Sequence, residues 1–179
     1  MAIKRNADDI SFMLDSLAKY FRLSLNKGKD IVSIADELNL AEVYLQIQKT
    51  RFVNSFDYVI NAEDEVLLCS IPKLVVQPII ENAILHGIQK NRGVVGMIIV
   101  TATKTEKEII LIVKDNGIGM TQESVEQILI NSSDNANRRS YGLYNVNERI
   151  KLLFGAEYGI TINSEIGVGT EVTIKIKAI

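Results

Sequence analysis

The sequence predicts a two-layer α/β sandwich preceded by a helical hairpin. Residues 1–50 place apolar side chains at helical spacing, whereas residues 51–179 alternate short β-branched segments with apolar helical stripes. Of the 179 residues, 47% are hydrophobic and 23% are charged, which supports a packed core. We therefore expect a helical segment at 1–50 and an α/β domain at 51–179, because strands and helices that alternate along a chain pack in layers.

Two helices are predicted before residue 50, separated near Gly28. Each keeps one row of residues at steps of three and four: Ile10, Leu14, Leu17 and Phe21 in the first, and Ile34, Leu38, Ala41, Leu45 and Gln48 in the second. Ser33 followed by Asp36 resembles a capping box at the start of the second helix. The pair either packs on its own domain or forms the lower part of a dimeric bundle, and both interpretations stay open here.

Strands and helices then alternate along the chain. Strands are predicted at residues 52–60, 95–103, 108–114, 158–164 and 169–177, the second and third paired with each other and the last two forming a hairpin. A helix is predicted to open at Pro72 and end at Gly87, and a short one covers 124–130. The helix at 142–154 has one apolar side, made of Leu143, Val146, Ile150 and Leu153. Residues 131–141 are polar and predict a mobile loop.

Composition excludes several classes of protein. The single cysteine, Cys69, cannot form an intrachain disulfide and is expected to fill the core in a reducing compartment. The single histidine, His86, excludes a Cys/His zinc cluster. A net charge of −2 without a basic face argues against a nucleic-acid partner. The longest uncharged apolar stretch, 94–100, is shorter than the roughly 20 residues of a membrane span, so we expect a cytoplasmic chain whose parent carries any anchor elsewhere.

Four short stretches carry polar or glycine residues where chemistry is expected. In 81–87, the side chains of Glu81, Asn82 and His86 interrupt an apolar helix, and a buried Asn needs a partner. Residues 115–120, DNGIGM, follow a strand directly, and 140–143, SYGL, open a helix whose amides can hold phosphate oxygens. Residues 167–170, GVGT, open the last strand. Each stretch alone is also explained by an ordinary helix, turn or hairpin.

The order of these stretches resembles the N, G1, G2 and G3 boxes of the GHKL (Bergerat-fold) ATP-binding superfamily, over residues 51–179. Within it, QPIIENAILHGI, DNGIGM, GLYNVNERI and YLQIQKTRF are similar to the LytS/YesM branch of sensor histidine kinases. The resemblance implies a mixed, mostly antiparallel sheet with helices on one face. It also implies that residues 1–50 are the C-terminal part of a dimerisation and phosphoacceptor region.

The resemblance implies that ATP and Mg²⁺ are the ligands. Asn82 falls on the Mg²⁺ ligand that bridges the triphosphate, and an amide oxygen suits a hard cation. Asp115 falls on the carboxylate that reads the exocyclic amine of adenine, and Thr170 on the hydroxyl that helps to hold a water there. His86 is expected to pack at the helix end or to bond the nucleotide.

The remaining predicted contacts come from glycine-containing segments. Gly117 and Gly119 let the chain pass close to the base, with Ile118 and Met120 packing on it, while Gly142 and Leu143 offer amides to phosphate. Residues 121–141 correspond to the ATP lid, with Arg138 and Arg139 either reaching phosphate or lying in solvent. The sequence departs from the family pattern at Leu85, where a phosphate-binding Lys is common, and at Ser140, where a glycine is expected.

The function implied is the ATP-binding catalytic part of a two-component sensor histidine kinase, which transfers the γ-phosphoryl group to a histidine outside this chain. The acceptor motif of that branch, Pro-His-Phe, does not occur in the sequence. The expected partners are therefore the acceptor segment of the parent kinase, homodimeric at full length, and a response regulator.

The alternatives are a GHKL-type ATP hydrolase and an anti-sigma-type serine kinase or nucleotide-binding regulatory module. Hydrolases of the superfamily place a general-base Glu four residues before the Asn, where this chain has Pro78. Glu81 remains the only candidate catalytic side chain, although it is turned about 100° from Asn82 around the helix.

Overall fold

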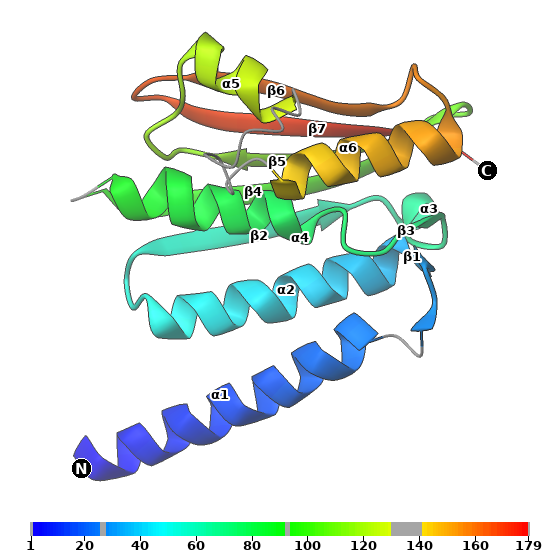
Figure 1. Cartoon of the computed structure of the whole chain (residues 1–179). Coiled ribbons are helices and arrows are strands. Elements are labelled where there is room, and N and C mark those ends of the chain that lie inside the picture. Colours follow the sequence, from blue (N-terminus) through cyan, green and yellow to red (C-terminus); the bar gives the residue numbers. More distant parts are fainter. Residues whose placement is uncertain (1, 26–27, 92–93, 130–140, 179) are drawn as a thin grey trace.

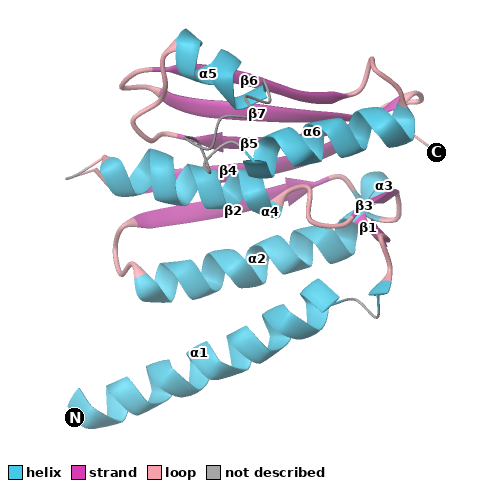
Figure 2. Ribbon diagram, viewed as in Figure 1, coloured by secondary structure: helices cyan, strands magenta, loops and turns pink. Residues whose placement is uncertain are grey.

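The computed structural model describes residues 2–25, 28–91, 94–129 and 141–178. One layer of helices lies on one layer of strands, with the first helix at the outer end of the helical layer (Figures 1 and 2). The elements are α1 (Ala2–Leu25), β1 (Ile31–Ser33), α2 (Ile34–Arg51), β2 (Phe56–Ala62), α3 (Asp64–Leu67), β3 (Ser70–Pro72), α4 (Gln77–Asn82), the π-helical turn η2 (Ala83–Gly87), the 3₁₀ turn η3 (Ile88–Lys90), β4 (Gly96–Lys104), β5 (Glu108–Asp115), α5 (Gln122–Leu129), α6 (Tyr141–Phe154), β6 (Gly159–Glu165) and β7 (Gly169–Lys177).

The main sheet has the strand order β2-β4-β5-β7-β6. Only β2 and β4 run parallel, and the other neighbouring strands are antiparallel. The helices lie on one face of this sheet (Figure 1). The predicted fold class, a two-layer sandwich with a mixed and mostly antiparallel sheet, is therefore confirmed. A second, small sheet joins β1 to β3, with Val32 opposite Ile71.

The core lies between the sheet and the helices that cover it. Alternate residues of the central strands are buried, as period-two side-chain geometry requires, among them Ile98, Val100, Leu111, Val113, Val172 and Ile174. The predicted row of the second helix is also buried, and its apolar members belong to the same core cluster: Ile34, Leu38, Ala41 and Leu45. Cys69 is a buried core residue, as expected.

The predicted apolar row of α6 is right except at its end. Leu143, Val146 and Ile150 are buried, but Leu153 is 54% exposed. Phe154 packs against the core in its place, because the step of four from Ile150 keeps to the buried face better than the step of three at this point of the helix.

Three predicted boundaries are wrong. The first strand begins at Phe56 rather than at 52, because α2 continues to Arg51 and the Phe52 amide still donates to the Gln48 carbonyl. Pro72 ends β3 instead of opening a helix, and α4 begins at Gln77 with Pro78 in its first turn. The helical course does not end at Gly87 either, since η3 extends it to residue 90.

A buried carboxylate explains why no helix starts at Pro72. Glu37, in α2 and only 2% exposed, accepts hydrogen bonds from the amides of Leu74, Val75 and Val76 at 2.9, 2.7 and 3.0 Å. Leu74 has a positive φ of 58°, which no helix contains. These contacts hold residues 73–76, hereafter the hinge segment, as an irregular turn before α4.

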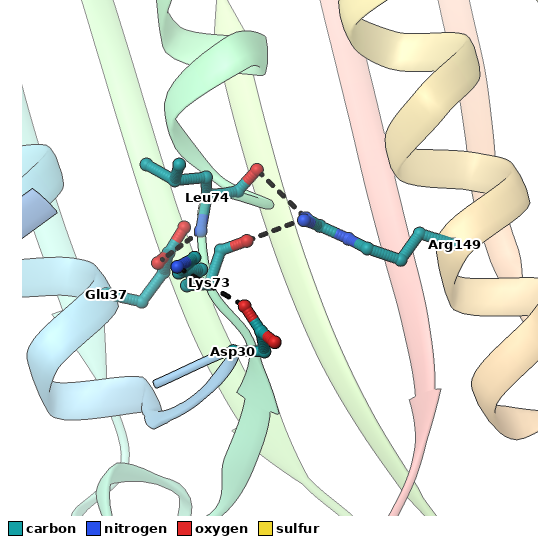
Figure 3. Close-up of polar contacts among 5 residues, drawn as sticks. All are labelled: Asp30, Glu37, Lys73, Leu74 and Arg149. Atoms are coloured by element: carbon teal, nitrogen blue, oxygen red, sulfur yellow. Dashed lines mark hydrogen bonds and ion pairs between the residues drawn. The ribbon is translucent and has the colours of Figure 1, made fainter. Parts of the chain in front are cut away.

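The last described helix holds the same segment from the other side. Arg149 of α6 donates to the carbonyls of Lys73 and Leu74 at 2.7 and 3.2 Å, and Lys73 forms an ion pair with Asp30 at 3.3 Å. Figure 3 shows Glu37 and Arg149 approaching the hinge segment from opposite sides. The helical segment and α6 are thus joined through four residues of backbone.

The first helix packs on α2 and leaves its own predicted row uncovered. The rings of Tyr20 and Tyr44 lie 6.0 Å apart between the two helices. In contrast, Ile10, Leu14 and Phe21 are 60%, 62% and 54% exposed. Among the described helices, none is both long and apolar enough to span a membrane.

Candidate functional site

A cavity of about 280 Å³ lies between the α4–η2 helical run and the central strands β5 and β7. Most of the predicted site residues line it together, although they come from four separate parts of the sequence: Asn82, His86, Asp115, Ile118, Gly119, Met120, Leu143 and Thr170. Glu81, Gly117 and Gly142 are not among its lining residues. The fold therefore brings the four motif stretches around one space.

Asp115 is the buried charge of this cavity. It ends β5 and lies opposite Thr170, near the start of β7, and it is 6% exposed. Its Oδ1 accepts a hydrogen bond from the Gly117 amide at 2.8 Å. Burial raises the pKa of the Asp115 carboxyl to about 6, against the opposing effect of hydrogen bonds from the amides of Gly117 and Thr170.

The loop after Asp115 fits the site because of two glycines. A Cβ on Gly117 would lie 2.4 Å from the Gly87 carbonyl carbon, and one on Gly119 would lie 1.9 Å from the Glu165 carbonyl oxygen. Gly119 also has a φ of 67°, which non-glycine residues rarely adopt. Gly117 thus packs the loop against η2, and Gly119 packs it against the β6–β7 hairpin. Their predicted close approach to the base stays a prediction.

The walls of the cavity are mostly aliphatic. They are formed by side chains from helices, loop and strands: Ile79, Val113, Ile118, Met120, Ile128, Leu143, Ile162 and Val172. Such walls surround the buried Asp115 carboxylate with mostly apolar groups. A flat, neutral ring with a hydrogen-bond donor on its edge fits this arrangement.

Polar residues follow one another along the helical side. Asn82 ends α4, and His86 and Lys90 follow at steps of four residues. Within the described part of the chain, the side-chain amide of Asn82 has no hydrogen-bond partner. Sequence reasoning missed Lys90, because it ended the helix at Gly87. The spacing of Asn82, His86 and Lys90 was the available signal, since residues four apart share a helix face.

Glu81 belongs to a different environment. Gln77 donates to its Oε1 at 2.7 Å and also to the hydroxyl of Tyr20 in α1. Glu81 therefore takes part in a polar contact with the helical segment, and its assignment as a catalytic side chain has no support from this geometry. Leu85, which stands where a phosphate-binding Lys is common, is 40% exposed.

The predicted lid is described only in part. Residues 122–129 form α5, which contributes Ser124, Gln127 and Ile128 to the cavity wall, three residues that sequence reasoning did not assign. Residues 130–140 of the predicted lid, with Arg138, Arg139 and Ser140, lie outside the described residues, and Tyr141 begins α6.

Comparison with known proteins places the chain in a family. Residues 70–178 match the family described as histidine kinase-, DNA gyrase B-, and HSP90-like ATPase, and residues 1–56 match the histidine kinase family. The sensor histidine kinase YesM of Bacillus subtilis (strain 168) is 36% identical over 93% of this chain. The sensor protein LytS of Bacillus anthracis is 33% identical over 92% of it. The chain spans 27% of YesM and 28% of LytS.

Solved structures agree on the fold. The histidine kinase domain of the blue-light activated kinase EL346 from Erythrobacter litoralis matches with a TM-score of 0.60 at 15% identity, over 98% of this chain and 82% of that domain. The catalytic domain of histidine kinase ThkA matches with a TM-score of 0.61 at 17% identity, over 84% of this chain and 99% of that domain. The resemblance inferred from the sequence motifs is confirmed. The chain belongs to the histidine kinase-, DNA gyrase B- and HSP90-like ATPase family, and it is similar to sensor proteins such as YesM and LytS.

Proposed function

We propose that this chain binds ATP and acts as the catalytic part of a sensor histidine kinase, transferring the γ-phosphoryl group to a histidine outside its 179 residues. The observation that carries the proposal is the buried Asp115 carboxylate in an aliphatic cavity, opposite Thr170 and beside the helix that carries Asn82. In this assignment Asp115 accepts a hydrogen bond from the exocyclic amine of adenine. The aliphatic walls hold the two faces of the ring.

Asn82 and Lys90 are the proposed contacts to the triphosphate and its metal. Mg²⁺ keeps several waters and takes few protein ligands when it is bound with phosphates. The side-chain amide of Asn82 fits this role because Asn82 lines the cavity and this amide has no hydrogen-bond partner among the described residues. When bound, the metal supplies positive charge to the phosphate oxygens. Lys90 lines the cavity with Asn82 and offers a second positive charge there. Leu85, at the position where a phosphate-binding Lys is common, offers none.

The protein's contribution to transfer is positioning, as it is in phosphoryl transfer generally. The cavity fixes the base through Asp115, and the helix holds the phosphate end through Asn82. His86, the only histidine of the sequence, lies in the cavity wall. It is therefore assigned to the nucleotide site and not to phosphoryl acceptance.

The kinase assignment is favoured over ATP hydrolysis. Pro78, in the first turn of α4, stands four residues before Asn82 and has no group that can take a proton from water. The relatives YesM and LytS also carry the names of sensor proteins. The partners proposed from this role are the acceptor-histidine segment, a second copy of the parent kinase and a response regulator, with this chain on the cytosolic side of an anchored parent.

Equilibrium binding tests the proposal directly. We expect the chain to bind ATP more tightly than GTP, and we expect Asp115→Asn to weaken ATP binding at least about tenfold, the value of a hydrogen bond to a charged acceptor, with little change for GTP. Asp15→Asn, at an exposed Asp of α1, is the matched control. A folded chain that shows no ATP binding, or an unchanged ATP affinity in folded Asp115→Asn, would contradict the assignment.

A further inference from the structure

Ser164 of β6 joins three segments that surround the cavity, although it is not among the cavity's lining residues. The Met120 amide, in the loop after Asp115, donates to its Oγ at 2.9 Å. Its Oγ donates to the Gly169 carbonyl at 3.0 Å. Its third contact is the hydroxyl of Thr170, with 2.8 Å between the two oxygens.

The direction of the third hydrogen bond follows from the other two. A carbonyl oxygen only accepts, so the single hydroxyl hydrogen of Ser164 lies on its bond to Gly169. The Met120 amide only donates, so it uses a lone pair of the Ser164 oxygen. Thr170 must therefore be the donor to Ser164. Because its one hydrogen is engaged there, the Thr170 hydroxyl offers only lone pairs to the cavity.

Two acceptors consequently stand side by side at the edge of the cavity. Asp115 and Thr170 are partners in the β5–β7 register, and both line the cavity. An ionised carboxylate accepts hydrogen bonds and donates none. This edge suits a ligand that presents hydrogen-bond donors, directly or through one water, and it disfavours a ligand whose carbonyl meets the same two oxygens.

We propose that Ser164 is a positioning residue that holds the Thr170 hydroxyl as an acceptor and thereby strengthens the preference for a 6-aminopurine over a 6-oxopurine nucleotide. The inference rests on the proposed binding of adenine through Asp115. Without the Ser164 hydroxyl, Thr170 is released, can rotate, and can donate to a 6-oxo group. The ratio of the affinities for the two nucleotides then falls, even if both affinities also change together.

ATP and ITP are suitable probes, because their bases differ only at the 6-substituent and the adjacent ring nitrogen. The measurement is the ratio of their dissociation constants for the full chain and its variants. We expect wild type to prefer ATP and Ser164→Ala to reduce that ratio about three- to tenfold, the range of one ordinary hydrogen bond. Ser164→Thr keeps the hydroxyl and should restore the wild-type ratio. Thr161→Ala removes an exposed hydroxyl from the same strand and should leave it unchanged.

A double-variant cycle separates positioning from a general structural effect. The ratio does not depend on the fraction of folded protein, because unfolded chains lower the apparent affinity for both nucleotides alike. In a Thr170→Val background, Ser164→Ala should leave the ratio unchanged, because the hydroxyl it orients is gone. An unchanged ratio in Ser164→Ala, or an equal drop in the Thr170→Val background, would overturn the role of Ser164. A wild-type chain that binds neither nucleotide would overturn the proposed function as well.

Discussion

Burial has two opposing effects on the Asp115 carboxylate. A carboxylate shielded from water makes a strong and selective acceptor, but its burial also raises its pKa to about 6. The sequence could predict that Asp115 belongs to the candidate site, because DNGIGM is a recognisable stretch after a strand, and Asp115 does line the cavity. It could not predict that Gly117 and Gly119 pack against Gly87 and the β6–β7 hairpin, since these contacts join segments far apart in the chain.

The raised pKa of Asp115 predicts a pH-dependent stability for the nucleotide-free chain. The folded pKa of about 6 lies above the ordinary value of 3.8. Folding therefore favours the protonated form of Asp115. Its contribution to the free energy of unfolding is fully present below pH ~4 and is lost as pH rises through ~6. At about 1.4 kcal/mol per pH unit between the two values, the loss is on the order of 3 kcal/mol.

The measurement is the free energy of unfolding in urea at pH 4 and pH 7. Asp115→Asn should lack this part of the pH dependence, whereas Asp15→Asn should retain it. A wild type and an Asp115→Asn variant with parallel pH profiles would show that burial does not shift this carboxyl.

The proposed role of Asn82 predicts that its replacement weakens nucleotide binding only when Mg²⁺ is present. Asn82→Ala removes the amide oxygen that is assigned to Mg²⁺ and leaves the Asp115 end of the cavity unchanged. We therefore expect the variant to lose the Mg²⁺-dependent part of ATP binding and to keep most of its metal-free affinity for ADP. Calorimetric titration of ATP and ADP with and without Mg²⁺ measures this, and an equal loss in all four titrations would make Asn82 a structural residue only.

At the scale of elements, repeating patterns could be predicted and irregular backbone could not. The strand pairs β4–β5 and β6–β7 and the buried row of α2 followed from period-two and helical spacing. The hinge segment did not, because its conformation depends on Glu37, which lies 37 residues before Leu74. In the sequence, Pro72 before an apolar run indicated a helix start, and only the tertiary contact moves that start to Gln77.

The hinge segment predicts a large stability cost at Glu37. Burial raises the pKa of the Glu37 carboxyl, opposed by the three hinge amides and by Arg149. Glu37→Ala leaves those amides without an acceptor, and buried amides cost about 1–3 kcal/mol each when unpaired. We expect a loss on the order of 3–5 kcal/mol in urea unfolding. Glu42→Ala, at an exposed Glu of the same helix, should change stability by less than about 0.5 kcal/mol. If Glu37→Ala lowered the free energy of unfolding by as little as Glu42→Ala does, other contacts would hold the hinge segment.

At the scale of the whole molecule, the described residues form the cavity around Asp115 and a first helix with an exposed apolar row. The apolar row of α1 remains exposed, with Ile10, Leu14 and Phe21 each more than half accessible. Of the two interpretations left open by the sequence, packing on the chain's own domain describes α2, whose apolar row belongs to the core cluster, and a dimeric bundle stays a prediction for the exposed row of α1. In the proposed function, the cavity and the acceptor histidine belong to different segments, which must meet for phosphoryl transfer.

This separation predicts that the chain binds ATP but does not label itself. With γ-labelled ATP and Mg²⁺, the chain alone should incorporate no phosphate and should hydrolyse ATP slowly, since Pro78 stands where a general base is needed. Adding a separate fragment with the acceptor-histidine segment of the parent kinase should produce label on that fragment. The transfer should be inefficient, because the covalent link that raises the effective concentration of the two parts is missing.

The label should be lost in acid and survive alkali, as a phosphoramidate does. The Asn82→Ala chain with the same fragment is the control and should give no label. Rapid turnover without a fragment would favour a hydrolase, acid-stable label would favour transfer to serine, and label on His86 of the isolated chain would contradict its assignment to the nucleotide site.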